Sequence, residues 1–198
     1  MSKDVAYYYT PASPWTYLGH QRFEAIAQRH GATIHYKPVD YGKIFPLSGG
    51  LPLGKRAPQR QAYRLAELKR WRDFLGVPLT LQPKYHPVAS DLAAQLIIAA
   101  EHAGAQPGPL SLALMRACWA EDRNISDAET LAAVATEQGL DGVKLVASAR
   151  TPEIVMLYEA LTRDAIDRQV FGAPFFIYKD EPFWGQDRLD FLDRALAR

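Results

Sequence analysis

The spacing of apolar residues changes twice near the start of the chain. Residues 5–9 form a short β-branched and aromatic run that predicts a strand. The spacing then becomes helical, with Ser13 and Pro14 suited to be N-cap and first helical residue and Gly31 suited to end the helix. Residues 33–39 alternate again and predict a second strand, parallel to the first. The apolar face of the helix comprises Trp15, Leu18, Phe23 and Ile26.

The last part of the chain predicts a hairpin followed by a helix. Residues 175–178 and 182–184 are two strand-like runs, and the link between them is too short for a parallel crossover. A helical pattern begins near Gln186 and Asp187 and places Leu189, Leu192, Ala195 and Leu196 on one face. The ending is therefore ββα.

Between these two parts the pattern is almost entirely helical. Residues 59–75 are amphipathic, Ser90 and Asp91 are expected to cap an apolar helix that must be buried, residues 126–129 have the form of a capping box, and a further helix runs from Thr151 to about residue 169. We expect an α/β protein with the layout of the thioredoxin superfamily and an inserted helical domain. Residues 1–44 and 168–198 would form the thioredoxin-like domain, and residues 45–167 the helical insertion.

Composition and charge restrict the possible partners. The chain is 48% hydrophobic and 23% charged, which is ordinary for a globular protein. Its 23 basic and 22 acidic side chains nearly cancel, so no overall field favours nucleic acid or an acidic membrane. The longest apolar stretch, residues 92–100, is too short to span a bilayer, and the first residues do not resemble a secretory signal. We expect a soluble, cytoplasmic protein without nucleic-acid or membrane partners.

The single cysteine limits the chemistry. Cys118 has no second cysteine with which to form an internal disulfide or a redox pair, so dithiol chemistry is excluded. It lies in an apolar helical run, where a free cysteine is usually a small core residue. The five histidines lack the close spacing of metal ligands, so we predict no metal site.

Ser13 is the first candidate for chemistry. It stands at the junction of the first strand and helix, where thioredoxin-like oxidoreductases carry two cysteines, and here the sequence is Ser-Pro-Trp-Thr. A helix N-terminus favours a thiolate, and a serine hydroxyl at the cap can donate a hydrogen bond to it. Since the protein supplies no cysteine there, the thiolate would come from a ligand, and glutathione is the natural candidate. The alternative is that Ser13 only caps the helix.

A second motif precedes the hairpin. Pro174 stands just before what we expect to be an edge of the sheet, where a proline needs a turn, a bulge or a cis bond. In thioredoxin-like proteins a cis-proline at this place faces the active-site helix. The preceding residue, Ala173, can then pair its backbone with a bound peptide in β-fashion, which suits a tripeptide such as glutathione.

The third motif opens the last helix. Gln186 and nearby backbone N–H groups can hold a carboxylate, Asp187 can pair with an α-amino group, and Arg188 offers a fork for a carboxylate or for a structural ion pair. These are the charged ends of a γ-glutamyl group. The alternative for Asp187 is an acidic residue that only complements the helix dipole.

Together the motifs resemble the 2-hydroxychromene-2-carboxylate isomerase family, relatives of the kappa-class glutathione transferases. The similarity extends nearly end to end and includes residues 51–56, 59–71, 76–78 and 83–87. It implies a glutathione cofactor and an aromatic carboxylate substrate. It also implies reversible addition of the thiolate to the substrate, and a homodimer. The implied cofactor-binding residues are Ser13, which would also be catalytic, Ala173, Pro174, Trp184, Gly185, Gln186, Asp187 and Arg188, and the implied substrate residues are Lys55 and Tyr85.

One departure and two alternatives qualify this interpretation. Some relatives carry Asn at the position we align with Gly54, so the substrate identity is open. Lys55 begins a basic run, most of which would be solvated, while one or two members pointing at the cleft would suit an anion. A kappa-like transferase, joining glutathione permanently to an electrophile, is the nearest alternative. A noncatalytic module that binds glutathione or a peptide is the second.

Overall fold

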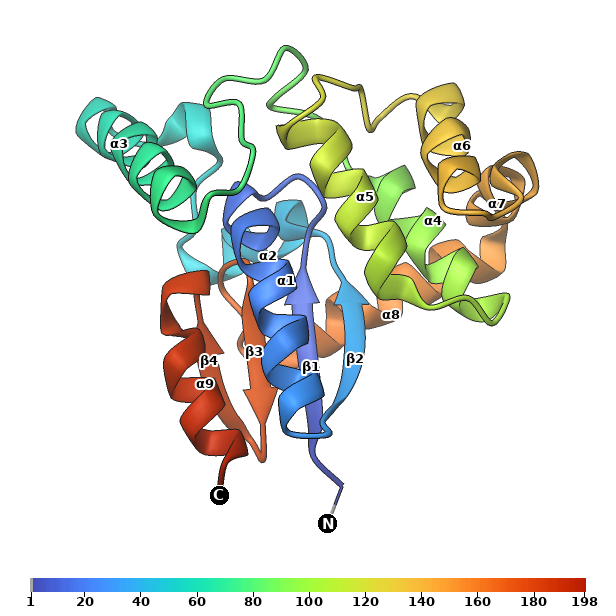
Figure 1. The fold of residues 1–198 in the computed structure, drawn as a ribbon. Coiled ribbons are helices and arrows are strands. Elements are labelled where there is room, and N and C mark those ends of the chain that lie inside the picture. Colours follow the sequence, from blue (N-terminus) through green and yellow to red (C-terminus); the bar gives the residue numbers. More distant parts are fainter. Residues whose placement is uncertain (1) are drawn as a thin grey trace.

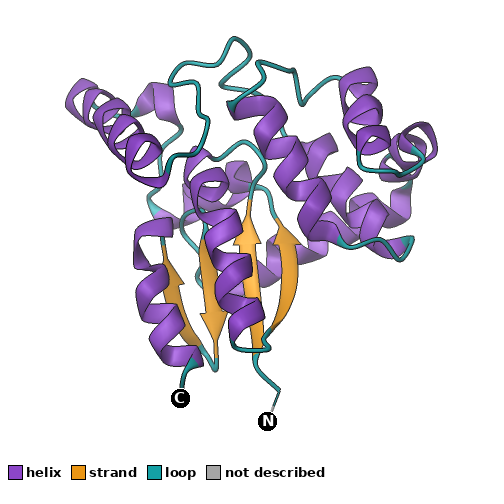
Figure 2. Cartoon of the chain, viewed as in Figure 1, coloured by secondary structure: helices purple, strands orange, loops and turns teal. Residues whose placement is uncertain are grey.

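A four-stranded mixed sheet forms the centre of the computed structural model, which describes residues 2–198 (Figure 2). Its strands are β1 (Asp4–Tyr9), β2 (Thr33–Pro38), β3 (Phe175–Tyr178) and β4 (Glu181–Trp184), in the order β2-β1-β3-β4. β1 pairs with β2 in parallel and with β3 in antiparallel, and β3 pairs with β4 in antiparallel. The predicted parallel pair and C-terminal hairpin are confirmed.

The two faces of the sheet pack into separate hydrophobic clusters because successive strand residues point to opposite sides. On β1, Tyr7 and Tyr9 belong to the larger cluster, whereas Tyr8 belongs to the smaller one. On β3, Phe176 joins the larger cluster and Phe175 the smaller one. The sheet is therefore buried on both faces.

Helices cover both faces of the sheet (Figure 1). α1 (Pro14–Arg29) and α9 (Leu189–Leu196) contribute to the larger cluster, while α2 (Tyr41–Ser48) and α8 (Pro152–Asp167) contribute to the smaller one. The short 3-10 turn η2 (Gln186–Arg188) precedes α9 and contacts α1. The first and last predicted helices are thus confirmed, and α1 lies between β1 and β2 in the sequence as expected.

Most of the remaining helices pack beside the sheet at the end where β1 and β2 finish (Figure 1). α5 packs on α1 and α4, and α6 and α7 pack on each other. The predicted buried helix is α4, whose residues 93, 94 and 96–100 are all buried. The division into a thioredoxin-like domain and an inserted domain remains a prediction. The remaining helices named in this paragraph, with the short turn before them, are η1 (Leu53–Lys55), α3 (Pro58–Leu75), α4 (Asp91–His102), α5 (Pro107–Trp119), α6 (Ala128–Glu137) and α7 (Gly142–Ala149).

Three local predictions are corrected. The N-cap of α6 is Asp127, which accepts from the Thr130 amide at 2.8 Å, so the capping box predicted from Ser126 is wrong. Ser90 occupies the N-cap position of α4, but its Oγ lies 2.9 Å from Thr10 Oγ1 and makes no capping bond. Pro174 precedes β3, which is an inner strand of the sheet rather than an edge. Proline is tolerated there because it lies before the first residue of the ladder.

Within residues 2–198, none of the helices has the length and apolar character required to cross a membrane.

Candidate functional site

Ser13 lies at the N-terminus of α1, directly after the turn that leaves β1. Its amide donates to Thr10 O at 3.1 Å, and its Oγ accepts from the Thr16 amide at 3.2 Å. The side chain is therefore the N-cap, as the sequence predicted, and its backbone is extended. The hydroxyl oxygen accepts in this cap, so its hydrogen can be donated to a ligand. Ser13 is 9% exposed, which places that donor at the rim of the protein interior.

Thr16 adds a second polar group to this turn. It is fully buried, and its Oγ1 has no hydrogen-bond partner among residues 2–198. With Thr16 standing three residues after Ser13, the two hydroxyls occupy the positions of the two cysteines in a thioredoxin-like motif. The sequence analysis did not assign Thr16 a role.

The Ala173–Pro174 peptide is cis, as the position of the proline suggested. Tyr8 of β1 pairs with Phe175 of β3. Pro174 therefore lies opposite the C-terminal end of β1, at the same end of the strands as the turn that leads to Ser13. The Ala173 amide and carbonyl have no hydrogen-bond partner within the described chain. A peptide that pairs in β-fashion requires a free backbone donor and acceptor, and Ala173 offers both at this end of the strands.

Trp184 covers the backbone next to Ala173. A side chain at Gly172 would collide with the Trp184 indole, so glycine is required for this close packing. Phe171 meets the same indole edge to face, with ring centroids 4.9 Å apart, and Trp184 is 53% exposed. The Gly185 amide donates to Pro174 O at 2.9 Å, which ties the end of β4 to the cis-proline.

The turn at residues 185–188 is held by an arginine of α1. Arg22 Nη1 donates to Gln186 O at 3.2 Å and to Gln186 Oε1 at 3.0 Å, and the Gln186 side chain is buried. Gly19 allows this approach because a β-carbon there would lie 2.7 Å from Gln186 Cβ. The Gln186 amide oxygen is thus already engaged within the protein, while its amide nitrogen makes no hydrogen bond within residues 2–198.

Asp187 and Arg188 are both exposed and bond to each other, with Arg188 Nη1 2.9 Å from Asp187 Oδ2. Gly185 has a φ of 96°, a left-handed value that suits glycine. The roles predicted for these residues in binding glutathione remain predictions.

Lys55 and Tyr85 lie in the helical part of the chain. Lys55 is exposed at the end of η1, and Tyr85 is 38% exposed on the segment that joins α3 to α4. That segment is tied to α1 at one end by Tyr17, whose hydroxyl donates to Pro78 O at 2.9 Å, and to the turn before α1 at the other by the Ser90 hydroxyl. The structure therefore places Tyr85 on a segment that is anchored at both ends near Ser13. No hydrogen bond joins Lys55 or Tyr85 to Ser13 or Ala173 among the described residues.

Two cavities lie near this part of the fold. One of about 260 Å³ is lined by Thr10 and Ala12 of the turn that leads to Ser13, by Asp40 and by Tyr158. The other, of about 600 Å³, is an open groove between α1 and the edge strand β2. Neither cavity is lined by a site residue predicted from the sequence, but the smaller one is lined by the turn before Ser13.

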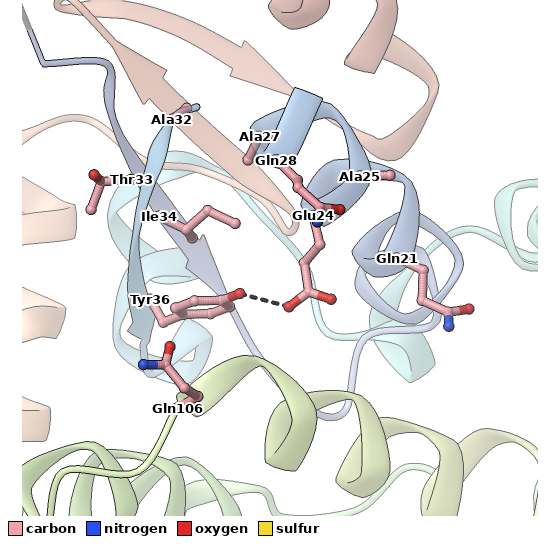
Figure 3. Close-up of a pocket in the computed structure, with 10 residues that line it drawn as sticks. All are labelled: Gln21, Glu24, Ala25, Ala27, Gln28, Ala32, Thr33, Ile34, Tyr36 and Gln106. Atoms are coloured by element: carbon pink, nitrogen blue, oxygen red, sulfur yellow. Dashed lines mark hydrogen bonds between the residues drawn. The ribbon is translucent and has the colours of Figure 1, made fainter. Parts of the chain in front are cut away.

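The larger groove is organised around a hydrogen bond between its two walls (Figure 3). Tyr36 of β2 donates to Glu24 of α1 at 2.6 Å, and the two side chains point toward each other. Burial by itself raises the pKa of Glu24, but hydrogen bonds from His20 and Tyr36 lower it overall. Burial, followed by the Glu24 carboxylate, raises the pKa of Tyr36. This paired arrangement is a structural link between α1 and β2.

Cys118 is a core residue. It is 1% exposed, and burial raises the pKa of its thiol to about 12. A thiol with this pKa is protonated at neutral pH and is a poor nucleophile. The prediction that Cys118 packs in the core is confirmed.

The order of strands and helices, the cis-proline before an inner strand and the serine-capped turn at the start of α1 define a thioredoxin-like protein. A family model, the DSBA-like thioredoxin domain, matches residues 4–197. The chain therefore belongs to the family of DSBA-like thioredoxin domains. This assignment agrees with the fold expected from the sequence.

Named relatives refine this placement. The chain is 29% identical over 196 residues to 2-hydroxychromene-2-carboxylate isomerase from Pseudomonas putida, covering 98% of this chain and 94% of the relative. A solved structure of a selenomethionine-labelled 2-hydroxychromene-2-carboxylate isomerase superimposes with a TM-score of 0.83 at 28% identity, over 98% of this chain and 95% of that one. Glutathione S-transferase kappa 1 from Caenorhabditis elegans is 23% identical over 98% of this chain and 91% of its own length. The resemblance stated from the motifs is confirmed, and these relatives support an isomerase-like or transferase-like activity.

No role was predicted for Arg22, and Arg64 was expected only as one member of the basic run that begins at Lys55. Arg22 lies within a helix and contacts Gln186, 164 positions away. Arg64 stacks on Trp119 across two helices, with its guanidinium carbon 5.8 Å from the ring centre. Neither contact has a local sequence signature, because surface-type arginines at helical spacing are usually solvated.

Proposed function

We propose that this protein is a glutathione-dependent isomerase of 2-hydroxychromene-2-carboxylate or a similar aromatic carboxylate. The observation that carries the proposal is that two features lie at the same end of the strands. These are a serine N-cap at the start of α1 and the free backbone of Ala173 beside the cis-proline. The isomerase relatives extend over nearly the whole chain and support the reaction class.

Glutathione fits the residues present in three respects. The Ala173 amide and carbonyl are available to a tripeptide backbone, and the Ser13 hydroxyl can donate to a sulfur anion. The exposed Asp187 and the free N–H groups at the start of η2 offer complements to the charged γ-glutamyl end. When bound, glutathione supplies a thiolate that adds to the substrate and leaves again unchanged.

The protein's own groups would act mainly on charge. The Ser13 hydroxyl and the α1 N-terminus stabilise negative charge on sulfur, both as the thiolate arrives and as it leaves. Ala173 would pair with the peptide backbone and hold it beside the helix terminus. No redox change is needed, which agrees with the burial of the sole cysteine.

The kappa transferase relative supports a second candidate, permanent conjugation of glutathione to an electrophile. A noncatalytic glutathione-binding or peptide-binding module is the third. Product analysis separates the first two, because an isomerase regenerates glutathione in each turnover and a transferase consumes it. Glutathione binding without turnover of any tested electrophile would indicate the module.

The first test follows the ultraviolet spectrum of 2-hydroxychromene-2-carboxylate with purified protein, with and without glutathione. We expect isomerisation only when glutathione is present, with the free thiol concentration unchanged at the end. If the protein binds glutathione and leaves the spectrum unchanged, the isomerase proposal for this substrate is wrong.

We also propose a cytoplasmic location, as expected from the sequence, and a homodimer, as the family resemblance implies. Light scattering of the purified chain measures the oligomeric state directly, and a mass near that of one chain would refute the homodimer.

Arg22 is expected to position the glutathione-binding turn. Arg22→Ala removes the bonds that hold Gln186, so the Michaelis constant for glutathione should rise about tenfold while kcat changes little. Steady-state kinetics at varied glutathione measures both quantities. Arg22→Lys should recover only part of the loss, because an ammonium cannot make the same two-oxygen contact.

The matched control is Arg29→Ala. Arg29 lies on the same helix and pairs with Asp193 of α9, away from the turn. Its loss should leave the Michaelis constant for glutathione unchanged. Equal effects of the two variants would mean that Arg22 acts only by holding α1 to the C-terminal segment.

A further inference from the structure

The charged residues of α3 and the turn before it fall into two groups. In the second half of the helix each cation has a carboxylate nearby: Lys69 and Arg72 contact Asp73, and Arg70 contacts Glu67. In the first half, and in η1 before it, none of the cations has a carboxylate within 4.0 Å among residues 2–198. This second set, here called the unpaired cation cluster, consists of Lys55, Arg56, Arg60 and Arg64.

Arg64 is the member of the unpaired cation cluster that packs against the rest of the protein. It is half-buried, and its guanidinium carbon lies 5.8 Å from the centre of the Trp119 ring. His86 packs against the same ring at a tilt of 49°, with centroids 4.6 Å apart. Trp119 is fully buried, and its Nε1 has no hydrogen-bond partner within the described residues. Arg64, His86 and an unused N–H donor therefore gather at one indole ring.

The electrostatics of this place show an excess of positive charge. Burial, and then the charge of Arg56, lowers the pKa of Arg64 to about 10. Burial and the charge of Arg60 lower the pKa of Arg56. Burial and the charge of Arg64 lower the pKa of His86 to about 4, so His86 is neutral near pH 7. Half-buried cations that repel one another are costly unless an anion compensates them.

The segment between α3 and α4 connects the Trp119 contacts of Arg64 and His86 to the candidate site. Trp119 O accepts from the Thr80 amide at 2.6 Å, which joins α5 to the segment between α3 and α4. Along that segment His86 contacts Trp119, and Val88, two residues further on, lines the cavity beside Thr10 and Ala12. Two residues span at most about 7 Å. Arg64 and the turn that leads to Ser13 are therefore connected through one segment, at positions two residues apart along it.

We propose that Arg64, supported by Arg56 and Arg60, forms a carboxylate-binding subsite of this protein. Its planar guanidinium can make two parallel hydrogen bonds to a carboxylate, and the Trp119 ring fixes its orientation from one side. The substrate carboxylate is the expected occupant, which rests on the proposed function. The glycyl carboxylate of glutathione is the other source of the same chemistry. The subsite makes Arg64 a specificity-determining residue, and Lys55 a more exposed member of the same cluster.

The direct test uses salicylate as an aromatic carboxylate probe, without glutathione or turnover. Isothermal titration calorimetry should show that Arg64→Gln weakens salicylate binding about tenfold to a hundredfold, the loss expected for a charged hydrogen-bonded pair. Arg70→Gln, on the same helix but paired with Glu67, should bind as the wild type does. Arg64→Lys should fall between them. Equal affinities for all four proteins would overturn the proposal.

His86 provides a second readout that a loss of folding would not imitate. Because the charge of Arg64 lowers the His86 pKa, a carboxylate bound to Arg64 should raise it, and Arg64→Gln should raise it without any ligand. Proton NMR titration of the His86 ring in the wild type, with and without salicylate, measures the shift. A His86 pKa that salicylate leaves unchanged would contradict the subsite.

Steady-state kinetics distinguishes the two possible occupants of the subsite, the substrate carboxylate and the glycyl carboxylate of glutathione. If the substrate occupies the subsite, Arg64→Gln raises the Michaelis constant for 2-hydroxychromene-2-carboxylate and leaves glutathione affinity unchanged. If glutathione occupies it, the variant loses glutathione affinity, and esterifying the glycyl carboxylate produces the same loss in the wild type; that result would overturn the assignment to the substrate. A wild type that binds salicylate through Arg64 but does not isomerise the chromene would refute the proposed function and leave the subsite standing.

Discussion

Replacing Ser13 with alanine should reduce kcat/KM for the glutathione-dependent isomerisation by roughly 10²-fold to 10³-fold, the usual effect of removing one preorganised donor from a developing anion. The hydroxyl is the side-chain donor available at the α1 N-cap, while the backbone N–H groups and helix dipole remain in the variant. Their persistence explains why activity should fall steeply without vanishing. Initial rates measured across glutathione concentrations give the ratio.

Loss of a helix cap complicates this variant, since Ser13 Oγ also accepts from the Thr16 amide. Removing such a cap costs about 1 kcal/mol of stability. Asp127→Ala is the matched control, because Asp127 caps α6 through the Thr130 amide in the same way and lies outside the site. We expect both variants to lose similar thermal stability and only Ser13→Ala to lose activity. Parallel losses of activity in both would mean that Ser13 acts as a cap alone.

The largest stability effect is expected at the centre of the sheet. Phe176→Ala should lower the free energy of unfolding by about 3 to 5 kcal/mol, the range for removing a buried aromatic ring. Phe176 is 1% exposed, and its ring stacks on Tyr7 with centroids 5.1 Å apart and contacts Phe23 at 4.5 Å. The cavity would open between β3 and α1, where neither backbone can move without breaking its own hydrogen bonds. Urea unfolding followed by circular dichroism gives the change.

Phe191→Ala serves as the comparison for this variant. Phe191 is 57% exposed on α9, so its removal should change stability by no more than about 0.5 kcal/mol. If both phenylalanine variants unfold at the same urea concentration, the packing of Phe176 between the sheet and α1 contributes far less than its burial implies.

The local sequence predicts most of the elements because their signals are local. Alternation at residues 5–9 and 33–39, helical spacing after Ser13 and the short link after residue 178 each depend on neighbours a few positions away. The corresponding strands and helices are present with nearly the expected bounds. The capping residue of α6 was misplaced by one position, because Ser126 and Asp127 are both good caps and the structure uses Asp127.

The candidate site likewise contains residues that local sequence predicts and contacts that it does not predict. Ser13 and the Ala173–Pro174 pair could be recognised because a cap and a proline have strong local requirements, and the structure places both at one edge of the sheet. The hold of Arg22 on Gln186 was not predictable. It joins residues 164 positions apart, and the sequence of either segment is equally compatible with a solvated arginine.

By itself, then, the sequence determined the order of elements, the absence of an internal dithiol and the helix cap at which a ligand thiolate would be stabilised. Only the tertiary structure decided that β3 is an inner strand, that Gln186 is buried against Arg22, and that Arg64 shares Trp119 with His86. The physical reason is that strand order and contacts between distant helices depend on the packing of whole faces. Propensity and capping act over one or two turns of chain, whereas these contacts arise only when the sheet and the helices close around a shared core.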